Sequence, residues 1–446
     1  MLPAAEAATV RGMSETAPAT PPLTSAARLR AIVGGSAGNL VEWFDWYVYA
    51  AFTLYFAPAF FPKGDQTAQL LGAATIFAVG FLMRPLGAWL MGVYADRRGR
   101  KAGLTLSITL MCAGSLMIAC LPTYAAIGAA APALLLIARL IQGLSLGGEY
   151  GASATYLSEM ADRNRRGFWS SFQYVTLISG QLLALVVLIG LQGVLSEDEL
   201  TSWGWRVPFA IGAVLAVIVF WLRSRLDETP SFTNAEGADE ARSGARLLFL
   251  KHPRETLIIF GLTAGGTLAF YTYTTYLQKF LVNTSGFTKE SASLISAAAL
   301  FVFMLAQPVV GAVSDRVGRK PVMIAFGVCG VLLTWPVMTG LASTQDAGTA
   351  FLLALVALIG VSGYTAINAV VKAELFPTSV RALGVAFPYA IANAIFGGTA
   401  EMVALWFKDI GFERGYFIYV TVMIGLSLIV YLTMRDTRRH SRIVED

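Results

Sequence analysis

Long apolar segments recur along the whole chain and restrict the folds that it can adopt. Of its 446 residues, 56% are hydrophobic and 14% are charged, and the mean hydropathy is +0.62. This is too apolar for a soluble protein of two or three domains. Segments such as 182–191 and 422–432 are apolar on every face rather than alternating, so they predict helices and not barrel strands.

A helix that crosses a bilayer needs about 20 mostly apolar residues, and the chain accommodates about twelve such helices. We expect them at residues 31–61, 69–95, 103–122, 125–160, 168–194, 204–222, 255–281, 288–314, 321–341, 349–375, 382–407 and 413–434.

Positive charge is distributed unevenly between the two sides of these predicted helices. Of the 33 Lys and Arg residues, 24 fall in the two termini and the even-numbered connections, and six lie on the opposite side. By the positive-inside rule, both termini and the central connection face the cytoplasm. The net charge of +5 therefore reflects membrane topology, and we expect no nucleic-acid partner.

The sequence contains two related halves. Residues 92–101 (GVYADRRGRK) recur 219 positions later as residues 311–320 (GAVSDRVGRK). Such a shift indicates duplication. We therefore expect a disordered cytoplasmic tail at 1–27, a six-helix bundle at 28–222, a cytoplasmic linker at 223–254, a second bundle at 255–434 and a cytoplasmic tail at 435–446.

The repeated motif resembles the signature of the major facilitator superfamily, which lies after the second and eighth helices. The resemblance implies an all-α membrane protein with 12 transmembrane helices in two six-helix halves. It also implies a latch on the cytoplasmic side, because the motif acids can pair with arginines of neighbouring helices. The alternative is that these charges only set the topology. The expected gating residues are Asp96, Arg97, Arg100, Asp315, Arg316, Arg319, Glu159 and Glu374.

Ionisable residues inside the predicted helices are functional candidates, because a charge at membrane depth is costly unless it is paired or faces water. Both histidines lie in predicted cytoplasmic segments, so proton chemistry in the membrane must use carboxylates. Glu42 and Asp45 share one polar and aromatic stripe of the first helix. The proton-coupling candidates are, in order, Glu149, Glu42 and Asp45, together with Arg139, whose RLIQG context resembles the superfamily's helix-four motif.

Two further cations lie one on each half. Arg84 can hold a carboxylate through two parallel hydrogen bonds, and Lys372 can hold a second one as a point charge, so we expect an anionic ligand between the halves. The alternative is internal ion pairing, such as Arg84 with Asp45 or Arg139 with Glu149. The expected substrate-binding residues are Arg84, Lys372, Asn368, Tyr364, Tyr271, Gln173 and Asn393.

Other segments narrow the resemblance to the metabolite:proton symporter family, whose members carry citrate, shikimate, osmolytes or 2-oxoglutarate. They are residues 39–45 (NLVEWFD), 81–87 (FLMRPLG), 139–151 (RLIQGLSLGGEYG) and 203–209 (WGWRVPF). Residues 171–185 (SFQYVTLISGQLLAL), 270–279 (FYTYTTYLQK) and 372–377 (KAELFP) are similar to the 2-oxoglutarate carriers of that family.

This resemblance implies a proton-coupled symporter that imports alpha-ketoglutarate (2-oxoglutarate) by alternating access across a bacterial inner membrane. The alternatives are a symporter of citrate or another dicarboxylate, or an osmolyte–proton symporter. No nucleophile motif or metal-ligand spacing is visible, so we expect neither an enzyme nor a cofactor or metal. The expected partners are a small organic anion, protons and the lipid bilayer, and the expected state is a monomer.

Overall fold

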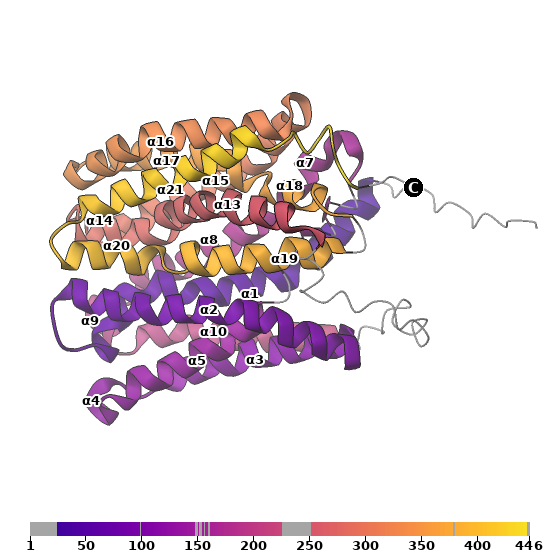
Figure 1. Cartoon of the computed structure of the whole chain (residues 1–446). Coiled ribbons are helices and arrows are strands. Elements are labelled where there is room, and N and C mark those ends of the chain that lie inside the picture. Colours follow the sequence, from indigo (N-terminus) through magenta and orange to yellow (C-terminus); the bar gives the residue numbers. More distant parts are fainter. Residues whose placement is uncertain are drawn as a thin grey trace, which may run out of the picture.

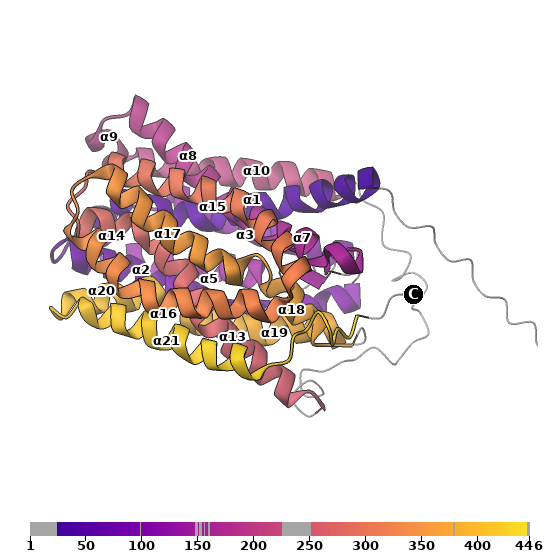
Figure 2. The ribbon, with the colours of Figure 1, turned by 90° about the horizontal axis from the view of Figure 1, so that it is seen from above.

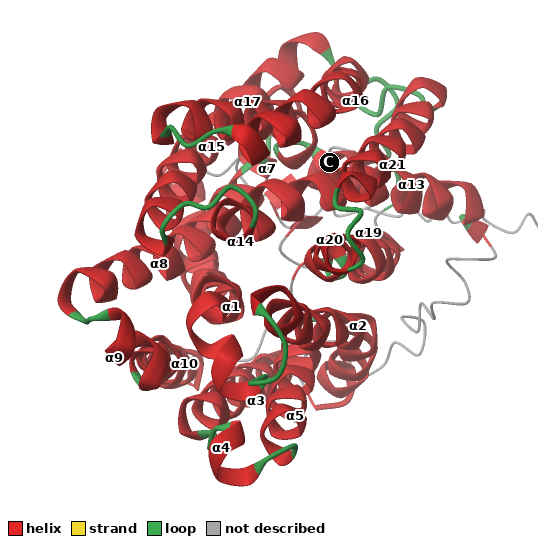
Figure 3. Cartoon of the chain, turned by 90° about the vertical axis from the view of Figure 1, so that its left-hand side faces the viewer, coloured by secondary structure: helices red, strands yellow, loops and turns green. Residues whose placement is uncertain are grey.

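The computed structural model describes residues 25–98, 100–147, 150, 154–155, 157–158, 161–224, 251–377 and 380–443. This described part is built of helices that run along one long axis, and it contains no strand (Figure 3). The predicted tail at 1–27 and linker at 223–254 lie largely outside the described residues. The predicted all-α architecture is confirmed.

The helices form two bundles that pack side by side, in the order of the chain (Figure 1). The first half comprises α1 (Ser25–Phe60), α2 (Gln66–Arg98), α3 (Arg100–Cys120), α4 (Tyr124–Ile127), α5 (Ala130–Leu146), η1 (Arg163–Arg165), α7 (Arg166–Ser170), α8 (Phe172–Val194), α9 (Glu197–Ser202), η2 (Gly204–Arg206) and α10 (Val207–Ser224). The second half comprises α13 (Pro253–Tyr271), η3 (Thr272–Tyr276), α14 (Leu277–Asn283), α15 (Lys289–Val317), α16 (Arg319–Ser343), α17 (Ala347–Thr365), α18 (Asn368–Glu374), α19 (Arg381–Ala392), η5 (Asn393–Gly397), α20 (Ala400–Asp409) and α21 (Arg414–Thr433).

Within the described residues, nine helical segments are long and apolar enough to cross a membrane by length and composition. Two shorter apolar helices, Thr105–Cys120 and Ala130–Leu146, accompany them. These eleven segments lie at eleven of the twelve predicted spans, and α1 covers the predicted first span at 31–61.

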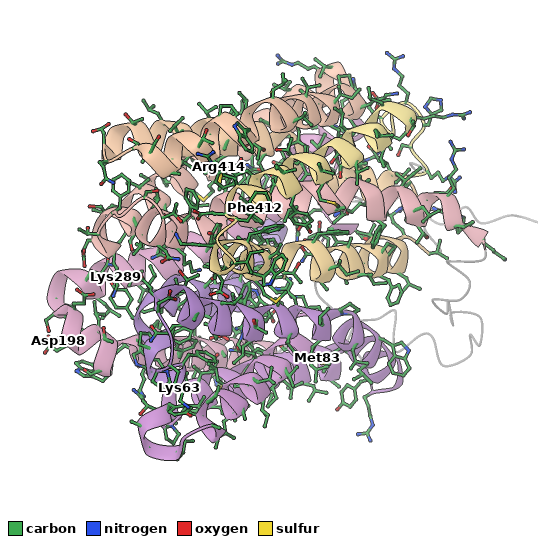
Figure 4. All side chains as sticks on the ribbon, turned by 60° about the vertical axis from the view of Figure 1, so that its left-hand side comes forward. Lys63, Met83, Asp198, Lys289, Phe412 and Arg414 are labelled. Carbon is green, nitrogen blue, oxygen red and sulfur yellow. The ribbon has the colours of Figure 1, made fainter. Side chains whose placement is uncertain are left out.

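The two ends of the bundle differ. The first turns of α1 and the C-terminal residues lie together at one end, which we call the tail end (Figures 1 and 2). The opposite end carries α4, α9 and α14, and we call it the α9 end. Asp198 of α9 and Lys289 of α15 both lie at this end (Figure 4).

Glycines bring α2 and α5 into close contact. A Cβ added at Gly143 would lie 2.1 Å from the carbonyl oxygen of Gly80, and one at Gly147 would lie 2.2 Å from that of Arg84. Small residues permit such approach between membrane helices. The packing places Arg84 of α2 and Arg139 of α5 on neighbouring helices close to α1.

Three spans of the second half are interrupted near their middle. The seventh contains the π-helical segment η3, the eleventh contains the π-helical segment η5, and the tenth breaks between α17 and α18. Hydropathy does not reveal such interruptions. They are tolerated at membrane depth where the backbone is buried in protein or lines a cavity, and they occur frequently at functional sites.

Candidate functional site

Arg84 is buried on α2 among aromatic rings. Its Cζ lies 3.9 Å from the ring centroid of Phe81, 4.3 Å from that of Trp46 and 5.3 Å from that of Trp43. Its Nε and Nη2 have no hydrogen-bond partner among the described residues. The ring faces stabilise the positive charge, while these N–H donors stay available for an anion.

Lys372 is fully buried on α18, and no described carboxylate forms an ion pair with it. Its Nζ donates to Asn368 Oδ1 at 2.7 Å and to the Tyr150 hydroxyl at 3.3 Å. It also lies 3.7 Å from the ring centroid of Tyr389. An unpaired buried ammonium is costly, so this site is suited to receive negative charge.

Tyr150 links the two halves at this second cation. Its hydroxyl donates to Asn368 Oδ1 at 2.9 Å, and its ring stacks on Tyr389 with centroids 3.9 Å apart. Tyr150 comes from the first half, whereas the other two residues come from the second. Sequence reasoning missed it, although it directly follows the singled-out Glu149.

Tyrosines also connect the two cations. Tyr47 of α1 donates to the Tyr271 hydroxyl at 3.5 Å, and the Tyr271 ring meets Phe81 edge to face at 5.3 Å. Tyr47, Tyr271 and Tyr389 all lie within electrostatic range of Arg84. We call Tyr47, Tyr150, Tyr271 and Tyr389 the tyrosine layer. Arg84 and Lys372 border this layer from opposite halves.

A small polar hollow adjoins the layer through Tyr47. Gln181 contributes from the first half, and Thr274, Thr275 and Gln278 contribute from the second. Gln181 donates to the Thr275 hydroxyl at 3.5 Å across the boundary between the halves.

The remaining predicted substrate-binding residues are Tyr364, Asn393 and Gln173, and Tyr364 lies within electrostatic range of Tyr150 and Tyr389. Tyr364 packs against Phe326 inside the second half, with ring centroids 5.7 Å apart. Asn393 of η5 accepts a hydrogen bond from the Thr267 hydroxyl. Gln173 is buried on α8. The structure therefore brings Arg84, Tyr271, Asn368 and Lys372 to the tyrosine layer.

Asp45 and Arg139 are joined through Gln142. The buried Asp45 carboxylate accepts hydrogen bonds from the Ser115 hydroxyl and from Gln142 Nε2, the latter at 2.9 Å. Gln142 Oε1 in turn accepts from Arg139 Nη1 at 2.7 Å. Arg139 Cζ lies 3.9 Å from the Trp46 centroid, so the Trp46 indole contacts both Arg139 and Arg84. Asp45 of α1 is thus linked to Arg84 of α2 through Gln142, Arg139 and Trp46.

The other proton-coupling candidates are placed as follows. Glu42 is buried on α1. Glu149 lies outside the described residues, and so does its alternative pairing with Arg139. The alternative pair of Arg84 with Asp45 is not formed, because Asp45 is hydrogen-bonded to Ser115 and Gln142.

Asp315 joins the halves at the tail end. Its carboxylate accepts the backbone N–H groups of Gly167 at 2.8 Å and Phe168 at 2.9 Å, in the first turn of α7. It also pairs with Arg319 at 2.8 Å. A carboxylate at a helix N-terminus is favoured by the helix dipole. The partners on α7 are backbone groups, which no sequence motif reveals.

The rest of the predicted gate is partly described. Arg319 lies 3.6 Å from Glu374, whose other oxygen accepts from Thr437 at 2.6 Å. Arg316 is exposed at the tail end. The side chains of Asp96, Arg97 and Arg100, and the whole of Glu159, lie outside the described part of the chain.

Sequence reasoning also missed a buried ion pair in the second half. Lys279 of α14 and Glu401 of α20 lie 3.0 Å apart, and both side chains are almost fully buried. The described residues contain no group of three or more His, Cys, Asp or Glu that could hold a metal ion.

The fold and the site together define a polytopic membrane protein of the transporter class. Its fold matches that of the xylose transporter XylE from E. coli in a partially occluded inward-open conformation, with a TM-score of 0.73 and 19% identity over 92% of this chain and 99% of that one. The family model "Sugar (and other) transporter" matches residues 31–251, and the model "Major Facilitator Superfamily" matches residues 274–445.

Two curated relatives match more than nine tenths of this chain. The alpha-ketoglutarate permease of Escherichia coli (strain K12) is 53% identical, covering 93% of this chain and 96% of that protein. The citrate-proton symporter of Salmonella typhi is 32% identical, covering 94% and 97%. The chain belongs to the major facilitator superfamily and, within it, to the metabolite:proton symporter family. It is a multi-pass protein of the bacterial inner membrane.

Proposed function

We propose that this protein is a proton-coupled symporter that imports 2-oxoglutarate (alpha-ketoglutarate) by alternating access. The observation that carries the proposal is the pair of buried cations, Arg84 and Lys372, which border one tyrosine layer from opposite halves and have no carboxylate partner among the described residues. The 53% identity to an alpha-ketoglutarate permease supports the choice of substrate.

A dicarboxylate suits this arrangement because it carries two anionic groups on one short chain. One carboxylate would use the free Nε and Nη2 donors of Arg84, and the other would take the ammonium of Lys372. The tyrosine hydroxyls of the layer would donate hydrogen bonds to the part of the substrate that lies between its two carboxylates. Only a ligand that reaches both cations engages both halves, so binding favours closure of one half upon the other.

Proton coupling follows from the charge of the substrate. An anion that enters a cell with an inside-negative potential works against about 2.3 kcal/mol per charge per 100 mV, so accumulation requires co-transported cations. A proton on Asp45 removes the negative charge that Gln142 links to Arg139. Substrate at Arg84 changes the field on the same network, because Trp46 contacts both arginines. We therefore place Asp45 at the centre of coupling, with Glu42 and Glu149 as further candidates.

The tail end is the cytoplasmic gate in this proposal. Asp315 holds the first turn of α7 while the gate is closed, and releases it when the halves separate. Both termini then lie in the cytoplasm, as the charge bias predicts. Both cations belong to one chain, so a monomer in the lipid bilayer suffices, and the protein needs neither catalysis nor a cofactor.

Citrate or another dicarboxylate is the second candidate substrate. It is supported by the 32% identity to a citrate-proton symporter. An osmolyte is less suitable, because two buried cations favour a dianion over a zwitterion.

The test is uptake of labelled 2-oxoglutarate into proteoliposomes under an inward proton gradient. We expect accumulation that an uncoupler abolishes and that unlabelled 2-oxoglutarate displaces better than citrate, succinate, shikimate or betaine. Better displacement by another competitor would change the substrate and keep the symport. Absence of gradient-driven uptake of any of them would contradict the proposed function.

A further inference from the structure

Among the described residues, the Lys279–Glu401 pair forms no hydrogen bond or ion pair with Arg84, Lys372 or Asp45. Lys279 Nζ donates to Glu401 Oε2 at 3.0 Å and to the Thr275 carbonyl at 3.1 Å. Lys279 is fully buried, and the Glu401 side chain is 6% exposed. The pair joins the seventh and eleventh spans in the half of the bundle nearer the α9 end.

Both helices that carry the pair contain a π-helical segment just before it. Lys279 follows η3, and Glu401 follows η5. Thr275, which holds the Lys279 ammonium through its carbonyl, also lines the polar hollow and accepts from Gln181 of the other half. Thr275 therefore links the pair to the boundary between the halves.

Stability does not explain why this pair is present. Desolvation of two buried charges offsets much of their mutual attraction, and apolar replacements of a buried pair are often neutral or stabilising. At membrane depth, ionisable residues mark ligand or proton pathways by default. The pair therefore requires a functional account.

We propose that Glu401 is a second proton-binding site of the transport cycle, with Lys279 as its counter-charge. The inference rests on the proposed function. A dianion that enters with one proton still moves one negative charge into the cell, and a second proton removes that cost. When Glu401 accepts the proton, Lys279 loses its anionic partner, and its uncompensated positive charge favours a bound dianion in the site between the halves. Proton and anion binding then favour each other.

Among the described residues, no second acid interacts with Glu401 and could compete for this proton. The titratable groups that face it are Lys279 from α14, Tyr276 from η3, Tyr49 from α1 and Tyr416 from α21. No titratable group of the described parts of α2 or α13, which also pack on α20, interacts with it. The three tyrosines are neutral, so Lys279 is the one charge among these groups that favours the ionised form.

The test is the proton stoichiometry of the full chain in proteoliposomes with the membrane potential held at zero by potassium and valinomycin. Under a tenfold proton gradient, two coupled protons support about 100-fold accumulation of 2-oxoglutarate at equilibrium and one supports about tenfold. We expect the wild type to behave as the former and Glu401→Gln as the latter. Glu413→Gln is the matched control, because Glu413, at the start of α21, pairs with Lys408 of α20 at 3.7 Å and both side chains are more exposed.

The double variant Lys279→Met/Glu401→Gln covers the case in which Glu401→Gln leaves Lys279 unpaired and blocks the cycle. A stoichiometry lower by one in either variant, with the control unchanged, supports the inference. Wild-type stoichiometry in every variant that still transports overturns it and leaves the symporter intact, as does loss of exchange in both variants while both remain folded. Absence of 2-oxoglutarate accumulation by the wild type contradicts the proposed function instead.

Discussion

The Arg84 guanidinium is stabilised by ring faces rather than by an acid. Three aromatic rings lie within 5.3 Å of its Cζ. A carboxylate partner would neutralise the Arg84 guanidinium and occupy its N–H donors. The aromatic rings instead lower the cost of burying the guanidinium and leave its Nε and Nη2 donors free for an anion. A transporter needs that property, because its site must bind and then release an anion in every cycle.

Arg84→Lys tests this arrangement. Lysine keeps the charge but lacks the planar group with parallel donors, and loss of a hydrogen bond to a charged group costs about 1.5–3 kcal/mol. We expect KM for 2-oxoglutarate to rise about tenfold or more. The measurement is initial uptake against substrate concentration, with Arg206→Lys as the control, because Arg206 donates to the Leu121 carbonyl near the α9 end. Equal KM values in both variants would remove Arg84 from the substrate site.

Asp45→Asn separates proton coupling from substrate binding. The Asn amide nearly preserves the shape of the Asp side chain and keeps an oxygen acceptor for Gln142. It cannot, however, bind and release a proton as a carboxylate does. We expect proton-driven accumulation to fall to the passive level while counterflow exchange continues. The same two assays on Glu149→Gln rank the two acids: the variant that loses accumulation and keeps exchange identifies the essential carrier. Undiminished accumulation by Asp45→Asn would exclude Asp45.

At the scale of elements, close backbone contact at the tail end depends on two glycines. A Cβ added at Gly167 of α7 would lie 2.4 Å from Arg319 Nη1 and 2.6 Å from the Gly311 carbonyl oxygen. Gly311 is the first residue of the repeated motif, so the motif glycine acts by allowing α15 to approach α7. The Asp315 carboxylate reaches the α7 amides for the same reason.

Gly167→Ala is expected to weaken this contact. Overpacking of a buried contact costs about 1–3 kcal/mol, and here the strain falls on the closed tail end. We expect the open form of the tail end to gain population, seen as faster labelling of a cysteine introduced at Ser171, together with slower uptake. Gly190→Ala on α8 is the control, because no atom lies within 4 Å of its added Cβ. Identical labelling rates in the two variants would contradict the role given to Gly167.

Hydropathy and the internal repeat sufficed to predict the helices and their division into two halves, because length and apolarity alone decide membrane insertion. The symporter prediction rested on motifs and is supported by the relatives. Interruptions such as η3 and η5 could not be predicted, since a π-helical segment leaves the average hydropathy unchanged. The roles given to individual site residues remain predictions.

Within the site, single charges could be predicted but their partners could not. Arg84 and Lys372 stand out because a membrane segment tolerates few charges. Tyr150 resembles any other aromatic residue of a helix until the packing places it on Asn368 of the other half. The link from Arg139 to Asp45 likewise depends on the orientation of Gln142, which spacing does not fix.

At the scale of the whole molecule, polar contacts join the halves at both ends. At the α9 end, Asn283 donates to Thr67 at 3.2 Å and Lys289 pairs with Glu197 at 2.6 Å. At the tail end, Asp315 accepts from Gly167 at 2.8 Å. A hydrogen bond contributes about 1 kcal/mol net, so either end can open at modest cost while the other stays closed.

Locking the α9 end therefore tests alternating access directly. A chain with Thr67→Cys and Asn283→Cys, in a background where Cys112, Cys120 and Cys329 are alanine, places two thiols where a hydrogen bond now joins α2 to α14. A disulfide breaks only by reduction or thiol exchange, so the linked end cannot open under oxidising conditions.

We expect oxidation or a short thiol crosslinker to abolish uptake and exchange, and reduction to restore both. The two single-cysteine variants should be unaffected by the same treatment. Because substrate enters at this end in the proposed cycle, a locked protein must also fail to bind 2-oxoglutarate from the α9 side while keeping access from the tail end. Full uptake by a completely crosslinked protein would show that the halves need not separate here, and would contradict the rocking of two bundles about the tyrosine layer.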